Sequence, residues 1–285
     1  MAWTAARWLR PLVAGVALIS IVASWLSSRE RATENLTAGS AAFSYPDPHP
    51  PSTCRQNNPQ QNTTALRTAG GVAITVRAPS NYDPRYEHGL LVVYAPAGAD
   101  RGASERFTGL TPNATGAGFL VAYVDHKPLN LSVIRDLGTI PALVAQSWCV
   151  DSHRIFLTGH SDGGTVAMAL ALSGGHYAGI APSAAGFNAT DLAGYQCPIP
   201  LAVYVAHGTA DELFPDFGRQ AAAWWATCNK CAAAPPALRA DGCLEYSGCA
   251  SGARTVYCEH GGRHSVWPAT NQRLIEFFAA RTAAS

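Results

Sequence analysis

The chain has 285 residues, and its 20 Lys and Arg nearly balance its 19 Asp and Glu, which gives a formal net charge of +1. Only 14% of the residues are charged and no basic patch or run occurs, which argues against nucleic acid as a partner. Beyond an N-terminal targeting segment, the chain is long enough for one α/β domain with a full hydrophobic core.

Residues 1–28 have the features of a secretory signal peptide. Arg7 and Arg10 precede an apolar run over residues 11–26, and polar residues end the run. No clean cleavage motif follows, so an uncleaved signal anchor stays open as an alternative. We therefore expect a secreted, extracellular protein, with the membrane as a partner only if this segment is retained.

Eight cysteines follow the targeting segment, and an even number of cysteines in an exported protein predicts disulfide bonds. Five of them lie between Cys228 and Cys258, which predicts a disulfide-stapled, loop-rich cap in that region. Cys228 and Cys231 are spaced as in some zinc or redox sites, but no second pair follows at zinc-finger spacing, so we expect no metal. Five N-x-S/T sequons permit glycosylation if the source is eukaryotic; they begin at Asn35, Asn62, Asn113, Asn130 and Asn188.

Residues 29–65 are expected to form an irregular arm or linker, because they contain five prolines together with many Asn and Gln residues. We expect Cys54 to attach this arm to the folded body. A single domain is expected to follow over residues 66–285.

Strand-like and helix-like segments alternate along this domain. A helical stretch that ends at Trp148 is interrupted by Gly138 and Pro141, and Pro141 fits the first turn of a helix. The alternation predicts an α/β fold with a mostly parallel central sheet and helices on both faces. In such sheets the active site lies beyond the carboxyl ends of the strands. The expected strands cover residues 72–76, 90–94, 119–123, 155–157, 201–205 and 255–257, and the other expected helices cover residues 165–172, 220–227 and 271–281.

Residues 155–172 combine a short apolar strand, the tight turn GHSDG and an Ala- and Leu-rich helix. Strand, G-x-S-x-G and helix in this order are the nucleophile elbow of α/β-hydrolases. The sharp turn exposes the Ser161 hydroxyl, and the flanking glycines avoid a Cβ clash. The free N–H groups of the helix, beginning with that of Asp162, face negative charge that forms at the serine. Ser161 is therefore the candidate nucleophile; the alternative is a glycine-rich turn that carries an exposed serine.

The partners of Ser161 are expected just after later strands. Asp211 follows the strand at residues 201–205, and His264 follows the strand at residues 255–257. The chain order Ser, Asp, His is that of α/β-hydrolases. We expect His264 to act as the general base and Asp211 to orient it and stabilise its cationic form.

Each of these assignments has a rival nearby. Glu212 is the rival acid, although a glutamate at a loop tip is more often solvated. His260 and His207 are rival bases, but His260 fits a plain surface histidine, and His207 at a strand end is expected to brace the acid loop through a hydrogen bond. His160 flanks the nucleophile and is expected to pack or to line the substrate site, because neighbours on a tight turn point apart.

Three sequence blocks resemble a secreted esterase family that includes feruloyl esterases and poly(3-hydroxybutyrate) depolymerases. They are GHSDGG at residues 159–164, HGTAD at residues 207–211 and GGRH at residues 261–264. The segment APSNY at residues 78–82 is similar to an early turn of the family. CVD at residues 149–151 and GCLEYSGC at residues 242–249 look like the cysteine-rich feruloyl esterase branch. The resemblance implies an α/β-hydrolase fold, a triad of Ser161, Asp211 and His264, and ester substrates.

The chain departs from the family pattern in two places. The family has His-Gly after its second strand, in the loop that supplies an oxyanion donor, where this chain has YAPAGA at residues 94–99. Pro96 has no N–H, which leaves Ala97 or Gly98 as the donor beside Asp162. The family's H-x-W-P is lengthened to HSVWP at residues 264–268, so Trp267 either lines an aromatic acyl pocket or packs within its loop.

These observations predict a secreted serine carboxylesterase that works through an acyl-enzyme. Feruloyl (hydroxycinnamoyl) esters of plant cell-wall polysaccharide are the leading substrate class, and short-chain hydroxyalkanoate polyesters are the alternative. A third hypothesis, which is not enzymatic, is a non-catalytic secreted binding protein on a hydrolase fold. We expect no cofactor and a monomer.

Overall fold

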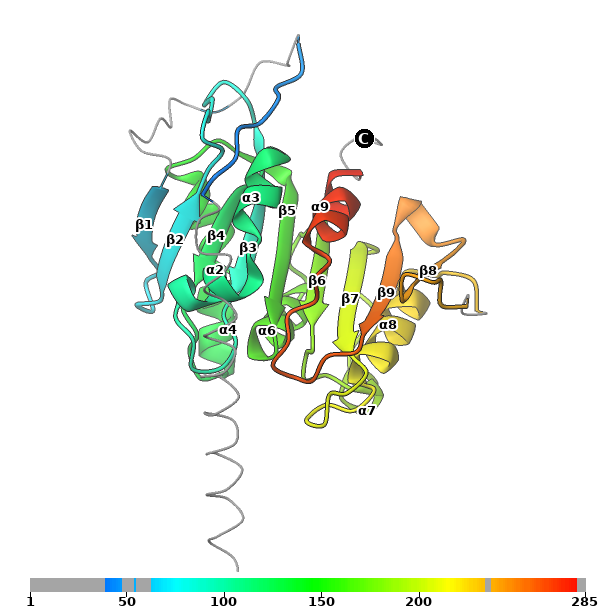
Figure 1. Cartoon of the computed structure of the whole chain (residues 1–285). Coiled ribbons are helices and arrows are strands. Elements are labelled where there is room, and N and C mark those ends of the chain that lie inside the picture. Colours follow the sequence, from blue (N-terminus) through cyan, green and yellow to red (C-terminus); the bar gives the residue numbers. More distant parts are fainter. Residues whose placement is uncertain (1–38, 48–53, 55–62, 234–236, 281–285) are drawn as a thin grey trace, which may run out of the picture. The chain divides into compact units, whose positions relative to one another are not determined.

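A computed structural model of the chain describes residues 39–47, 54, 63–233 and 237–280 (Figure 1). By its contacts the chain divides into two units, Met1–Thr37 and Ala38–Ser285, and the described residues belong to the second unit. The expected targeting segment and most of the expected arm lie outside the described residues. No helix in the described part of the chain combines the length and apolar character needed to span a bilayer.

The second unit is built on one sheet, with nine strands among the described residues in the order β1-β2-β4-β3-β5-β6-β7-β9-β8. Neighbouring strands are parallel from β4 to β9 in this order, whereas β1, β2 and β8 join antiparallel at the two edges. The prediction of a mostly parallel sheet is thereby confirmed. The strands are β1 (Thr63–Arg67), β2 (Ala73–Arg77), β3 (His88–Tyr94), β4 (Leu120–Val124), β5 (Val150–His160), β6 (Gly179–Ser183), β7 (Ala202–Gly208), β8 (Cys243–Tyr246) and β9 (Thr255–His260).

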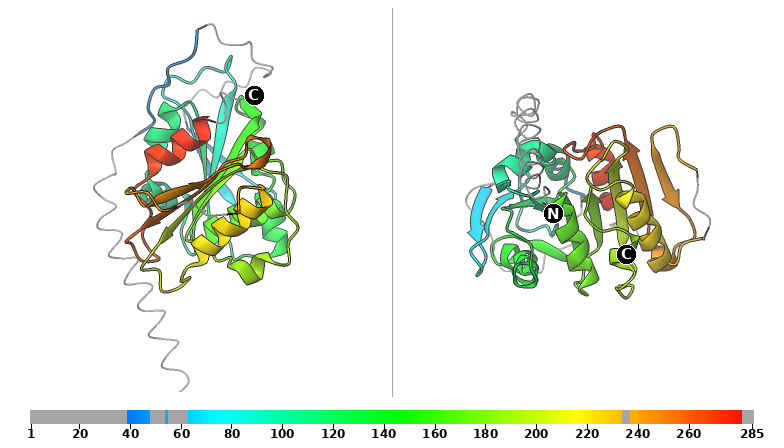
Figure 2. Two further views of the ribbon diagram at one scale, coloured as in Figure 1. Left: turned by 90° about the vertical axis from the view of Figure 1, so that its right-hand side faces the viewer. Right: turned by 90° about the horizontal axis from the view of Figure 1, so that it is seen from below.

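Helices cover both faces of the sheet, as predicted. The core on one face joins the sheet to α4, α5, α6, α7 and α8, and the core on the other face joins it to α3 and α9. Seen from the carboxyl ends of the strands, the two helical layers lie on opposite sides of the sheet (Figure 2). The helices are α2 (Arg101–Thr108), α3 (Thr111–Gly116), α4 (Leu131–Leu137), α5 (Ile140–Ala145), α6 (Asp162–Leu172), α7 (Ala189–Leu192), α8 (Phe217–Cys228), the 3-10 turn η2 (Ala250–Gly252) and α9 (Asn271–Ala279).

Strand β3 illustrates why the apolar runs form strands in the middle of the sheet. Leu90 and Val92 belong to one core, and Leu91 and Val93 belong to the other. Because successive side chains of a strand point to opposite faces, a strand covered on both faces needs apolar residues at every position. All seven residues of β3 are buried.

The structure contains elements that the sequence patterns did not predict, namely β1, β6, β8, α2, α3 and α7. Strand β6 lies in the centre of the sheet although it contains Pro182, which cannot donate to a neighbouring strand. Strand β1 begins at Thr63 and so includes the last residues of the expected arm. In the helical stretch before Trp148, α4 and α5 separate at Gly138 and Thr139, and Pro141 lies in the first turn of α5 as expected.

Four disulfides connect all eight cysteines. The bond between Cys54 and Cys149 attaches the arm to the start of β5, as expected. The disulfides expected between Cys228 and Cys258 are present, but the region is not a cap, because it contributes the last two strands of the sheet, and Cys243 of β8 lies opposite Cys258 of β9. The zinc or redox alternative is also wrong, since Cys228 and Cys231 are bonded to different partners. The pairs are Cys54–Cys149, Cys197–Cys228, Cys231–Cys249 and Cys243–Cys258.

Candidate active site

Ser161 forms the sharp corner between β5 and α6. Its backbone has φ 54° and ψ −119°, a combination that a non-glycine residue holds only when the surrounding structure enforces it. Its N–H donates to the carbonyl oxygen of Ser183 on β6 over 2.9 Å. Gly163 allows α6 to approach β3, because a Cβ at this position would lie 2.0 Å from the carbonyl oxygen of Tyr94. The glycines of the motif are thus required by close backbone contacts.

Asp211 lies in the loop after β7 and is buried, with 4% of its surface exposed. Its Oδ1 accepts hydrogen bonds from the N–H groups of Leu213 and Phe214, each over 2.9 Å. Burial by itself raises the pKa of this carboxyl, but the N–H of Phe214 and the ring of His264 outweigh burial and hold the pKa below its ordinary value. Asp211 is therefore a carboxylate at neutral pH.

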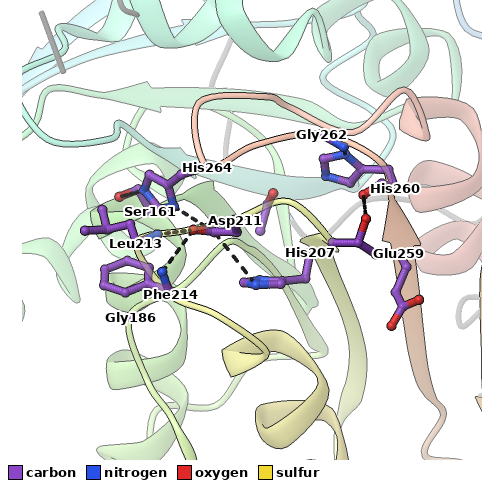
Figure 3. Close-up of polar contacts among 12 residues, drawn as sticks. Ser161, Gly186, His207, Asp211, Leu213, Phe214, Glu259, His260, Gly262 and His264 are labelled. Atoms are coloured by element: carbon purple, nitrogen blue, oxygen red, sulfur yellow. Dashed lines mark hydrogen bonds and ion pairs between the residues drawn. The ribbon is translucent and has the colours of Figure 1, made fainter. Parts of the chain in front are cut away.

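His264 lies in the loop after β9 and contacts both Asp211 and Ser161 (Figure 3). Its Nδ1 is 2.8 Å from Oδ2 of Asp211, and its Nε2 is 2.9 Å from Oγ of Ser161. Because a carboxylate only accepts, Nδ1 carries the ring proton and Nε2 accepts from the serine hydroxyl. The structure thus brings together three side chains from the carboxyl ends of three strands, in the arrangement that activates a serine for attack on a carbonyl carbon.

The rival residues occupy different positions. Glu212 is exposed beside the acid. His260 is half-buried at the end of β9, and its Nδ1 accepts the N–H of Gly262 over 3.2 Å. His207 is buried behind Asp211, but the expected hydrogen bond is not formed, because its Nε2 lies 3.7 Å from Oδ2 of Asp211. Burial, the largest cause, lowers the pKa of the imidazoles of His207 and His260.

His160 is buried, with 3% of its surface exposed. Its Nε2 donates to the backbone carbonyl oxygen of His264 over 2.5 Å, and its Nδ1 lies 3.1 Å from Oγ of Ser183. Burial, assisted by the nearby His264, lowers the pKa of this imidazole to about 3, so the ring is neutral. Of the two roles expected for His160, packing or lining the substrate site, these contacts favour packing that holds the loop of His264.

Aromatic rings surround the two histidines of the site. The ring of Phe214 meets the ring of His264 edge-on with centroids 5.0 Å apart, and Phe107 of α2 meets His160 in the same way at 5.1 Å. Trp267 lies 6.3 Å from both Phe107 and His160 and is only partly buried. Its indole N–H donates to Oδ1 of Asn271 over 2.8 Å, which fixes the orientation of the ring. Trp267 is thus packed on the aromatic set and also retains an accessible surface.

The loop after β3 and the start of α6 supply the backbone groups near Ser161. Within the described part of the chain, the N–H groups of Ala97 and Asp162 have no acceptor. The N–H of Gly98, in contrast, donates to Nδ1 of His126 over 3.2 Å, so that of the two donors expected in this loop only Ala97 is free. His126 was not predicted from the sequence, because it belongs to no motif. The clue in the sequence was that the loop after β3 lacks the histidine that the resembled family has there.

The described residues include no cluster of three or more His, Cys, Asp or Glu side chains arranged to hold a metal ion.

Solved structures share this architecture at low sequence identity. The acetyl xylan esterase from Aspergillus awamori superposes with a TM-score of 0.61 at 14% identity, over 76% of this chain and 99% of that one. The S-formylglutathione hydrolase from Staphylococcus aureus does so with a TM-score of 0.56 at 14% identity, over 76% of this chain and 97% of that one. The chain has an α/β-hydrolase fold.

One relative is more similar to this chain in sequence than these structures are. Feruloyl esterase D of Neurospora crassa is 28% identical over 215 aligned residues, which cover 67% of this chain and 73% of the relative. No protein-family model matches the chain. The similarity confirms the resemblance to feruloyl esterases that the motifs indicated.

Proposed function

We propose that this α/β-hydrolase is a carboxylesterase with Ser161 as nucleophile, His264 as general base and Asp211 as the acid. The observation that carries the proposal is the continuous contact from Oγ of Ser161 to Nε2 of His264 at 2.9 Å, and from Nδ1 to Oδ2 of Asp211 at 2.8 Å. Such a chain lets the imidazole accept the serine proton while the carboxylate stabilises the resulting cation. It also supports a hydrolase over a binding protein, because binding alone does not need a serine paired with a base.

The reaction follows from these positions. Oγ of Ser161 attacks the ester carbonyl carbon as its proton passes to Nε2 of His264, and the carbonyl oxygen becomes an oxyanion. The N–H groups of Asp162 and Ala97 are the proposed donors to that oxyanion, because both are free of other acceptors among the described residues. His264 returns the proton to the leaving alkoxide, and water then releases the acid from the acyl-enzyme by the same steps.

The proposed substrates are feruloyl esters of plant cell-wall polysaccharide, and the protein is proposed to act outside the cell. The similarity to feruloyl esterase D supports a feruloyl group as the acyl part of the substrate. The aromatic set of Phe107, Phe214 and Trp267 beside the two histidines offers a surface suited to an aromatic acid. Four disulfides fit an exported protein.

The role of Ser161 is tested by Ser161→Ala with p-nitrophenyl acetate. We expect kcat to fall by at least about 10⁴-fold while the folded structure is retained, because the nucleophile alone is lost. Ser152→Ala is the matched control, since Ser152 is exposed at the opposite end of β5, and it should keep full activity. Full activity of the Ser161→Ala protein would exclude this serine as the nucleophile.

The substrate class is tested by comparing methyl ferulate with a 3-hydroxybutyrate oligomer. We expect kcat/KM to be at least about tenfold higher for methyl ferulate, because aromatic side chains pack more favourably against the ferulate ring than against an aliphatic hydroxybutyrate unit. A higher kcat/KM for the oligomer would contradict feruloyl esters as the substrate class and support the polyester alternative. It would not contradict the proposed triad. An inactive wild-type protein would favour the binding protein.

A further inference from the structure

His126 is the second residue after β4, and it joins two segments that are distant in sequence. Its side chain is mostly buried, with 15% exposed. Nδ1 accepts a hydrogen bond from the N–H of Gly98 over 3.2 Å, and Nε2 lies 3.0 Å from Oδ2 of Asp162. One imidazole therefore connects the loop after β3 to the first residue of α6.

The two contacts together assign the protonation of the ring. The N–H of Gly98 is a donor, so Nδ1 of His126 must be the nitrogen without a proton. The ring proton is then on Nε2 and is donated to the carboxylate of Asp162. A neutral imidazole in this tautomer satisfies both partners at once.

The same segment after β4 also holds the rest of the loop. The backbone N–H of His126 donates to the carbonyl oxygen of Ala99 over 3.1 Å. Oδ1 of Asp125 accepts the N–H of Arg101 over 2.8 Å, and its carboxylate is 3.1 Å from the guanidinium of the same residue. The loop from β3 to α2 is thus attached to the end of β4 at successive positions.

These attachments end on the groups that flank Ser161. Ala97, which has a free N–H and is exposed, precedes Gly98, and Asp162 has the other free N–H. An oxyanion hole is effective when its donors are held in place before the reaction, and a misplacement of about 1 Å reduces catalysis by about 10²-fold. A side chain that fixes both segments would therefore set the spacing of the two donors.

We propose that His126 is a positioning residue of the oxyanion hole, which holds the Ala97 and Asp162 N–H groups at the spacing that the transition state needs. The inference rests on the proposed function, because this spacing matters only if an ester is cleaved at Ser161. His126 contacts neither the serine nor the base, so it acts on the reaction only through the two backbone segments.

The test separates the two contacts of the ring with isosteric variants. His126→Asn places an amide oxygen near the position of Nδ1 and retains the Gly98 contact, whereas His126→Gln reaches Asp162 instead. We expect His126→Ala to lower kcat on p-nitrophenyl acetate by about 10- to 100-fold with KM changed by less than about twofold, and the two isosteres to lie between alanine and wild type. Binding of phenylboronic acid, which forms a tetrahedral adduct with the serine, should weaken in parallel with kcat.

His153→Ala is the matched control, since His153 is exposed near the amino end of β5, and it should behave as wild type. Unchanged kcat and boronate affinity in His126→Ala, or a change in KM alone, would overturn the inference while leaving an active wild type and an inactive Ser161→Ala protein as support for the proposed function. If the alanine variant does not fold, full kcat in both isosteres overturns it equally. A wild-type protein without esterase activity overturns both proposals.

Discussion

The two sides of Ser161 are constructed in different ways. On one side, Asp211 and His264 present side chains from the loops after β7 and β9, and short motifs mark both residues. On the other side, the proposed oxyanion donors are backbone N–H groups, and His126 after β4 connects the segments that carry them. Side-chain chemistry therefore leaves a signature in the sequence, whereas backbone chemistry depends on contacts that no local motif records.

The largest expected effect is on the side-chain half of the site. Asp211→Asn keeps the shape of the acid but removes its charge and lets Nδ1 of His264 lose its proton, so we expect kcat to fall by about 10⁴-fold. The measurement is kcat on p-nitrophenyl acetate, with Glu212→Gln as the control because Glu212 is exposed and adjacent. A comparable loss of kcat in the Glu212→Gln protein would indicate that Glu212 takes part as the acid.

A smaller effect is expected at Gly163, where α6 packs against the end of β3. Gly163→Ala would bring a Cβ within 2.0 Å of the carbonyl oxygen of Tyr94, a backbone atom at the end of β3 that cannot rotate away. We expect the free energy of unfolding to fall by about 3 kcal/mol, as for severe overpacking. We also expect lower kcat in the folded fraction, because the clash pushes the loop after β3 away from α6.

The control for this substitution is Gly194→Ala, since Gly194 is exposed and a Cβ there meets nothing within 4 Å. Urea denaturation should show it within about 0.5 kcal/mol of wild type. Equal stability of the Gly163→Ala and Gly194→Ala proteins would mean that α6 and β3 separate freely, and the two halves of the site would then be less rigidly connected than the structure indicates.

The smallest effect concerns the pH dependence of stability at His160, beside the nucleophile. Burial lowers the pKa of this imidazole to about 3, below its value of about 6.5 in an unfolded chain. The unfolded state therefore binds the proton first, so the contribution of His160 is present above pH 6.5 and is lost as pH falls toward about 3.

His160→Gln retains an amide donor for the carbonyl oxygen of His264 but does not titrate. Unfolding free energies from urea denaturation between about pH 6.5 and 4 should therefore decline less steeply for the variant than for wild type. His207 and His260, whose pKa values burial also lowers, contribute equally to both proteins. Parallel pH profiles would show that the pKa of His160 does not differ between the folded and the unfolded protein.

The sequence predicted the parts of the fold that depend on local pattern. The apolar runs that became β3, β4 and β7 identify themselves because both faces of these strands are covered. Strand β6 was missed, since a five-residue segment with a proline and a glycine reads as a turn, and only its position between β5 and β7 makes it a strand. The antiparallel edge strands β1 and β8 were missed for a related reason, because they are short and only partly apolar.

In the candidate site, too, the sequence predicted the residues that local motifs mark and missed a contact between distant segments. Ser161, Asp211 and His264 could be chosen from the sequence, because an elbow motif and two strand ends are visible along the chain. The connection through His126 could not be chosen, because its partners lie 28 and 36 residues away and one of them is a backbone group. The Gly98 N–H, expected as a possible oxyanion donor, is occupied by this ring in the folded chain.

Local sequence alone sets which segments become buried strands, where the elbow turns, and which acid and imidazole follow the later strands, since periodicity, glycine sterics and chain order act over neighbouring residues. The disulfide partners, the central position of β6 and the use of His126 to join two backbone segments emerge only in the folded chain. These features depend on the register of the sheet and on contacts between loops, and hydrogen bonds to backbone groups place no demand on the identity of the residue that supplies them.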